Sequence, residues 1–141
     1  MKRTEELINE IVAAENPETF ISENAEDMIN LSLSQYLRSK LEEHNQKKAT
    51  IFKKAGMEGS NYGYELFRND EKIPSRNILL AICLAFSFTL EETQMALHCA
   101  GISQLYPRDA RDVYIIFGIQ NGLSLEEIDE LLESQGLETI L

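Results

Sequence analysis

The chain has 141 residues, a formal net charge of -11, two cysteines and three prolines. This length suits one compact core, or a small domain with a helical extension. The cysteines, Cys83 and Cys99, lie in apolar surroundings without metal-ligand spacing, which predicts buried thiols in a reducing compartment and no metal site. The N-terminus is charged and polar, and no apolar run approaches about 18 residues, so we expect a cytoplasmic protein that makes no membrane contact.

Basic residues are concentrated in one part of this acidic chain. Nine of the thirteen Lys and Arg residues lie between Arg38 and Arg76, where six acidic residues leave a local balance of +3. The rest of the chain has four basic and eighteen acidic residues. This asymmetry favours a positive face for a polyanion, carried on an acidic body. The alternative is a solvated helix surface that binds no partner.

Prolines and most glycines fall between segments of helical periodicity, which predicts an all-α chain. Residues 1–31 are expected to form an acidic N-terminal helical arm. Its first helix ends near Pro17, and a weaker second helix follows. The apolar stripe of the first helix consists of Leu7, Ile8, Ile11 and Val12.

Three helices are predicted next. The first runs from a cap at Ser32 or Ser34 to about Asn45, with leucines spaced by four on one face. Two short helices follow, over about 46–54 and 60–68. Between them, the segment 55–59 supplies glycine where a tight turn needs a positive φ.

From Pro74 onward the sequence nearly repeats itself after 35 residues. The segment Thr89-Leu90-Glu91-Glu92 matches Ser124-Leu125-Glu126-Glu127, and Arg76 matches Arg111. Each copy predicts a helical hairpin whose second helix opens with a capping box and closes at a glycine, Gly101 or Gly136. We expect two stacked hairpins in an acidic C-terminal body. The alternative is coincidence between common capping sequences.

Three short helices with a glycine turn between the second and third are typical of a helix-turn-helix. The stretch from about Ser34 to Gly101 resembles the lambda-repressor-like, or XRE-type, family of DNA-binding domains. Its most family-like part is Ile73-Pro74-Ser75-Arg76-Asn77-Ile78-Leu79-Leu80 followed by Phe88-Thr89-Leu90-Glu91-Glu92. The later segment Leu105-Tyr106-Pro107-Arg108-Asp109 resembles bacterial regulators of this type. The resemblance implies a lambda-repressor-like helix-turn-helix domain over 32–101, followed by a C-terminal helical hairpin extension over 102–141.

Three features depart from the family pattern. Phe52 stands where a small alanine usually lets the scaffold and recognition helices approach closely. The loop from Gly56 to Asn61 is about one residue longer than usual, and Arg68-Asn69-Asp70-Glu71 replaces the customary end of the recognition helix. We expect these departures to change the recognition geometry rather than the fold.

The resemblance implies a sequence-specific transcriptional regulator that binds double-stranded DNA, with residues 60–68 as the recognition helix. Asn61 could pair with adenine and Arg68 with guanine or phosphate, while Gly63 would leave room for close backbone approach. Tyr64 would either contact phosphate or be half-buried. Lysines at the start of the scaffold helix, and basic residues at the next helix start, would hold phosphates. The predicted DNA-binding residues are Lys47, Lys48, Ser60, Asn61, Tyr64, Arg68, Lys72 and Arg76.

Other functions are weighed against this one. The chain has no phosphate loop, zinc-protease pair, nucleophile elbow or CxxC, and its two histidines lie far apart, so we expect neither catalysis nor a cofactor. The rival hypothesis is a protein-protein interaction or adaptor module that keeps the helix-turn-helix fold without binding DNA.

Protein partners are also expected. A homodimer would use the C-terminal hairpins, through 113–117 and 128–132, or the N-terminal stripe of Leu7, Ile8 and Ile11. The alternative is that both stripes close the monomer core. The acidic N- or C-terminal helices offer a further surface for a protein partner.

Overall fold

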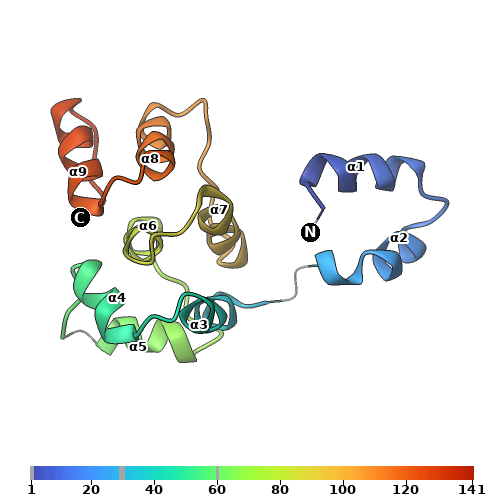
Figure 1. The fold of residues 1–141 in the computed structure, drawn as a ribbon, viewed down its shortest axis with the longest axis horizontal. Helices are drawn as coiled ribbons and strands as arrows, with labels where there is room; N and C mark the ends of the chain where they lie inside the picture. The colour runs from blue at the N-terminus through green and yellow to red at the C-terminus, as the bar shows by residue number, and fades with distance from the viewer. Residues whose placement is uncertain (1, 29–30, 60) are drawn as a thin grey trace. The chain divides into compact units, whose positions relative to one another are not determined.

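The computed structural model describes residues 2–28, 31–59 and 61–141 (Figure 1). All of its regular elements in these ranges are helices, which confirms the all-α prediction. The chain divides into two compact units, residues 1–30 and 31–141. No described helix is long and apolar enough to cross a membrane.

The first unit contains α1 (Thr4–Ala13), α2 (Pro17–Glu23) and a short 3-10 helix, Ala25–Asp27. Asn16 caps α2 by accepting a hydrogen bond from the Thr19 amide, and Pro17 occupies the first helical position. Lys2 pairs with Glu10 at 2.7 Å. Helix α1 buries none of its residues, so its predicted apolar stripe is largely exposed.

The second unit contains seven helices in its described residues. They are α3 (Leu33–Glu43), α4 (Lys48–Lys54), α5 (Asn61–Arg68), α6 (Arg76–Ala85), α7 (Leu90–Cys99), α8 (Ala110–Gln120) and α9 (Leu125–Ser134). Ser32 opens α3 with a capping box that includes Gln35, which decides between the two predicted caps. Helix α3 packs against α5 and α7, and α4 packs against α6.

Helix α6 lies at the centre of this unit, with α4 and α5 on one side and α8 and α9 on the other (Figure 1). Most of its side chains are buried, including Leu79, Leu80, Ile82 and Cys83. Its neighbours α4, α7 and α9 therefore share one core. Cys83 is fully buried there, and burial raises the pKa of its thiol.

The structure confirms the two predicted hairpins, α6–α7 and α8–α9. Thr89 and Ser124 open the second helices with complete capping boxes, and Gly101 and Gly136 follow the helix ends with a φ of +68° each. The equivalence extends to the first helices. Arg76 donates from Nε to the Ser103 carbonyl at 3.1 Å, and Arg111 donates from Nε to the carbonyl 35 residues later, that of Glu138, at 2.8 Å.

The hairpins also contact one another in a reciprocal way. The Arg76 guanidinium bonds both carboxylate oxygens of Asp112, at 3.0 and 2.8 Å. In the opposite direction, Arg111 donates to the Asn77 side chain at 2.8 Å. Asn77 and Asp112 are themselves equivalent positions of the 35-residue repeat. Contacts that repeat with the roles of the partners exchanged are the signature of a two-fold relation, here an approximate one within a single chain.

A partly buried ionic cluster joins α3 to the start of α7. The Glu92 carboxylate lies 2.9 Å from Lys40 Nζ and 2.8 Å from His44 Nε2. It also accepts the Thr89 amide at 3.0 Å as part of the capping box. Burial alone would raise the pKa of Glu92, but the contacts with His44, the Thr89 amide and Lys40 lower it to about 2.

We predict acid lability from this cluster. Because the folded-state pKa of Glu92 lies below the ordinary value of about 4.3, its contribution to stability is present above that value and is lost as pH falls toward 2. Glu92→Gln keeps a cap acceptor but removes the charge, so its free energy of unfolding should be lower at pH 6 and vary less between pH 6 and 3. Urea denaturation across this range measures both effects. Glu91→Gln, an exposed neighbour in the same turn, is the control, and the same flattening there would contradict the assignment.

Candidate nucleic-acid interface

Helices α4 and α5 are joined by a turn of the predicted kind. Helix α4 ends at Lys54 with Ala55 as its C-cap, and Gly56 follows with a φ of +73°. The Met57 amide then donates to the Phe52 carbonyl at 2.7 Å, which closes the last turn of α4. Gly59 has a φ of +81°, and α5 begins at Asn61. The predicted site residue Ser60 lies outside the described residues.

The contact between the two helices depends on Gly63. A Cβ atom at this position would lie 2.7 Å from Cε1 of Phe52, well inside van der Waals contact. The Phe52 ring also packs edge-on against Tyr64 and Phe67, with ring centroids 4.6 and 5.5 Å apart. Gly63 is buried, and the close approach that it allows is that of the bulky Phe52 ring of α4.

Helix α5 has sharply different faces. Leu66 and Phe67 are fully buried, whereas Asn61, Tyr64 and Arg68 are exposed on the opposite side. Of the two roles left open for Tyr64, the structure shows the packing role, because the ring lies against Phe52 while part of the side chain is exposed. A phosphate contact by Tyr64 stays a prediction. Arg68 lies 3.9 Å from Glu65, an exposed pairing that costs little to separate.

Three predicted lysines lie beside this helix or just before α4. Lys47 is exposed and makes no ion pair with any residue that the structure describes. Lys48 Nζ lies 5.8 Å from the centroid of the Phe67 ring, and Lys72 Nζ lies 4.6 Å from that of Tyr62. These cation–π contacts hold two ammonium groups against rings carried by α5.

Arg76 is the first residue of α6, and its guanidinium is bound within the chain. Four of its five N–H groups donate hydrogen bonds, two to the Asp112 carboxylate and one each to the carbonyls of Ser103 and Gln104. The pKa of Asp112 reflects the pairing, because the hydrogen bond and charge of Arg76 lower it although burial opposes them. Arg76 therefore joins the two hairpins. A phosphate contact by Arg76 stays a prediction, and it would compete with this partly buried pair.

Two further basic residues of the stretch 38–76 are also used internally. Arg38 donates to the Phe67 carbonyl at 2.7 Å, near the C-terminal end of α5, and lies 3.8 Å from Asp70. Lys40 pairs with Glu43 and Glu92. Of the nine basic residues, six remain outside these internal pairs in the described structure: Lys47, Lys48, Lys53, Lys54, Arg68 and Lys72.

Asp70, an acidic residue of the same stretch, is also bound within the chain. Its carboxylate accepts hydrogen bonds from Ser34 and from Ser32, which lower its pKa. The segment after α5 is thereby tied to the first turn of α3. Sequence reasoning missed this link, because the 36 and 38 residues that separate the partners give no periodic signal.

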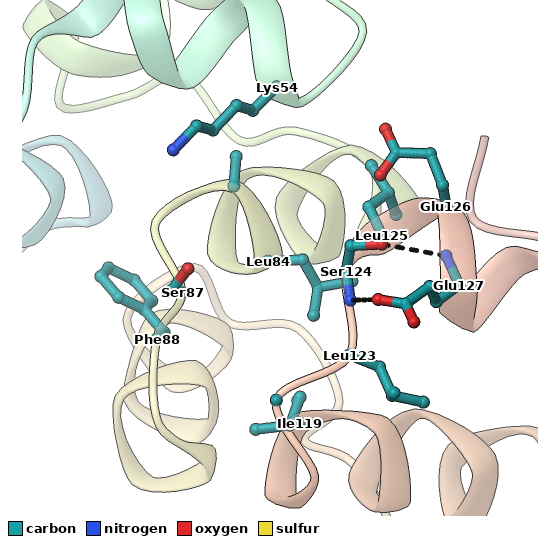
Figure 2. Close-up of a pocket in the computed structure, with 12 residues that line it drawn as sticks. Lys54, Leu84, Ser87, Phe88, Ile119, Leu123, Ser124, Leu125, Glu126 and Glu127 are labelled. Carbon is teal, nitrogen blue, oxygen red and sulfur yellow. Dashed lines mark hydrogen bonds between the residues drawn. The ribbon is translucent and has the colours of Figure 1, made fainter.

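An open cleft of about 410 Å³ lies between α4 and the turns of the two hairpins (Figure 2). Lys54 points toward it from α4, and Glu126 and Glu127 stand across from it at the start of α9. The Glu127 carboxylate is held by the Ser124 amide at 3.0 Å. The cleft therefore has a basic residue of α4 on one side and two acidic residues of α9 on the other.

Comparison of the chain with protein families, with curated proteins and with solved structures finds no match. Within the described residues, no group of three or more His, Cys, Asp and Glu side chains is arranged to hold a metal ion.

We predict that the fit of Gly63 against Phe52 is energetically costly to disturb. Glycine to alanine in an unhindered helix interior stabilises by about 1 kcal/mol, whereas overpacking a core costs about 1–3 kcal/mol. Gly63→Ala should therefore be destabilising overall, by about 1 kcal/mol. In a Phe52→Leu background, which removes the ring atom in the way, the same change should be neutral or stabilising. Chemical denaturation of the four proteins measures the coupling, and an equal loss in both backgrounds would disprove the contact.

Proposed function

We propose that residues 32–101 form a lambda-repressor-like helix-turn-helix domain, and that the protein is a transcriptional regulator binding specific sequences in double-stranded DNA. Helix α4 is the scaffold helix and α5 the recognition helix. The observation that carries this proposal is the amphipathic character of α5. Asn61, Tyr64 and Arg68 share its exposed face, opposite Leu66 and Phe67 in the core.

The exposed face of α5 suits base recognition. An eight-residue helix is about 12 Å long and fits the major groove, which is about 12 Å wide. The Asn61 amide matches the hydrogen-bonding edge of adenine, and the Arg68 guanidinium matches that of guanine. Tyr64 lies between them with its ring anchored on Phe52.

The surrounding cations suit phosphate binding. Lys47, Lys48 and Lys72 flank α5 or the start of α4, and Lys53 and Lys54 follow on α4. Such residues set the position of a protein on DNA but do not select its sequence. The acidic remainder of the chain repels DNA elsewhere, which favours one orientation of approach.

A protein-interaction module is the second candidate. The observation that favours it is Glu65, which lies on α5 within 3.9 Å of Arg68 and offsets its charge. Eighteen acidic against four basic residues outside 38–76 point the same way. The two candidates differ in salt dependence, because DNA binding releases counterions and the binding of a neutral protein surface does not.

The first test measures how the affinity for DNA depends on salt. Its ligands are DNA duplexes that the protein selects from a random pool. We expect affinity to fall steeply with salt, and Lys47→Ala to flatten the log-log slope by about 0.9 without changing the selected sequence. Arg108→Ala is the matched control, since it removes the same charge from an exposed position in the C-terminal extension. Fluorescence anisotropy from 50 to 300 mM salt measures both slopes. Equal slopes for both variants would reject Lys47 as a phosphate contact, and a parental slope near zero would favour the interaction module.

Base preference provides a separate test of α5. Asn61→Ala and Arg68→Ala should each relax selection at one or two base positions, because a two-pronged base contact discriminates by about 1–3 kcal/mol. Sequencing of duplexes selected by each variant measures this preference. Gln135→Ala, an exposed amide after α9, is the control and should select the parental sequence. Unchanged selection by both α5 variants would reject α5 as the recognition helix.

A further inference from the structure

The open cleft between α4 and the hairpin turns has an apolar floor. Its volume of about 410 Å³ lies within the range of about 300–1,000 Å³ that is usual for small-molecule sites. The floor consists of Leu84 near the end of α6, Ile119 near the end of α8, and Leu123 in the turn that follows (Figure 2). All three side chains are only partly buried, so they offer apolar surface to a molecule within the cleft.

The 35-residue repeat shows how this space arises. Leu84 is equivalent to Ile119 and Phe88 to Leu123, so corresponding turns of the two hairpins line the cleft. A Cβ atom at Gly122, in the second turn, would meet no atom within 4 Å. The space beside this turn is therefore unfilled.

Ser87 is the residue of the first turn that is equivalent to Gly122. Its φ is +59°, in the left-handed region that favours glycine. The Ser87 side chain lines the cleft and is exposed, and its hydroxyl forms no hydrogen bond with any residue that the structure describes. A strained backbone position that presents an unused polar group indicates a binding role for this side chain.

Charged side chains of opposite sign lie on opposite sides of the cleft. Lys54, the last residue of α4, is on the same side as the Ser87 hydroxyl, and Glu126 lies across from them in the first turn of α9 (Figure 2). Both Lys54 and Glu126 are exposed, and neither forms an ion pair with another residue in the described ranges. The two charges are therefore free to bind groups of opposite charge on one ligand.

We propose that this cleft binds a small linear zwitterion, with a carboxylate and an ammonium group at opposite ends of an apolar chain, as in an ω-amino acid. Lys54 and the Ser87 hydroxyl bind the carboxylate, and Glu126 binds the ammonium group. The apolar chain of the ligand lies on Leu84 and Ile119.

Ligands with a single charge fit the cleft less well. A cation is attracted by the net charge of -11, but it leaves Lys54 without a partner and next to a like charge. An anion pairs with Lys54 but meets the carboxylates of Glu126 and Glu127. A zwitterion pairs with both sides.

An NMR titration of the full chain without DNA tests the proposal, with 6-aminohexanoate as the probe. We expect a dissociation constant on the order of 1 mM, because a ligand of this size makes two solvent-exposed ion pairs and covers a short apolar floor. Changes in backbone amide shifts should be confined to the two hairpin turns and the ends of α4 and α6. Because DNA is absent, the outcome is separate from that of the proposed function.

Three related compounds serve as control ligands. Hexylamine and hexanoate each lack one charge, and norleucine is an isomer of 6-aminohexanoate that carries both charges at one end. Each should bind about threefold to fivefold more weakly, as expected for the loss of one exposed ion pair. The acidic chain by itself attracts hexylamine more strongly than a zwitterion, so tighter binding of 6-aminohexanoate reports the contribution of Lys54.

Substitutions then assign the contacts. Lys54→Gln and Ser87→Gly should each weaken the binding of 6-aminohexanoate by about threefold, without weakening that of hexylamine, whereas Glu126→Gln should weaken both. Ser87→Gly places glycine at a positive φ, so its melting temperature should not fall below that of the parent. The controls are Lys53→Gln and Glu130→Gln, exposed positions of α4 and α9 that do not line the cleft, and both should bind like the parent.

Four outcomes would overturn the proposal. The first is the absence of shift changes with 6-aminohexanoate at concentrations up to about 20 mM. The second is a set of shift changes spread over acidic surfaces away from the cleft. The third is hexylamine or norleucine binding as tightly as 6-aminohexanoate. The fourth is unchanged binding by the Lys54, Ser87 and Glu126 variants.

Discussion

The burial of α6 is the constraint on which the rest of the second unit depends. None of the ten residues of this helix is exposed, and six of them are buried. Such an apolar helix needs neighbours on several sides, and α4, α7 and α9 pack against it. The helices proposed to bind DNA and the hairpins that follow them therefore do not fold as separate domains. They share one core, and the position of α4 depends on hairpin residues far along the chain.

Polar contacts then fix how the layers around α6 are oriented. Arg76–Asp112 joins the first helices of the two hairpins, and Glu92 joins α7 to α3 through Lys40 and His44. A buried ion pair adds little net stability over an apolar replacement, but removing one partner costs about 3–5 kcal/mol. Such contacts destabilise every arrangement of the helices in which the two partners are apart. Apolar packing alone discriminates less strongly between different rotations of one helix against another.

The parts that the sequence predicts are those governed by local chemistry. Helix caps such as Ser32, Thr89 and Ser124, and the positive-φ turns at Gly56 and Gly101, depend on residues within one turn of each other, so their spacing is visible in the sequence. In contrast, Arg38, Lys40 and Arg76 bind partners within the chain that lie 27 to 52 residues away in the sequence. The net charge of a segment does not show whether a basic residue is already paired, so only the fold identifies the residues that are left to bind an external partner.

The glycines at Gly63 and Gly118 carry a consequence for sequence change. A Cβ atom at Gly118 would overlap Ile128 of α9, just as one at Gly63 would overlap Phe52 of α4. The first hairpin has Cys83 and Thr93 at the positions equivalent to Gly118 and Ile128, two medium side chains in place of one absent and one large. At both contacts a larger residue in place of the glycine avoids overlap only if its partner becomes smaller. The two substitutions of each pair should therefore not be additive in stability, although they lie on different helices.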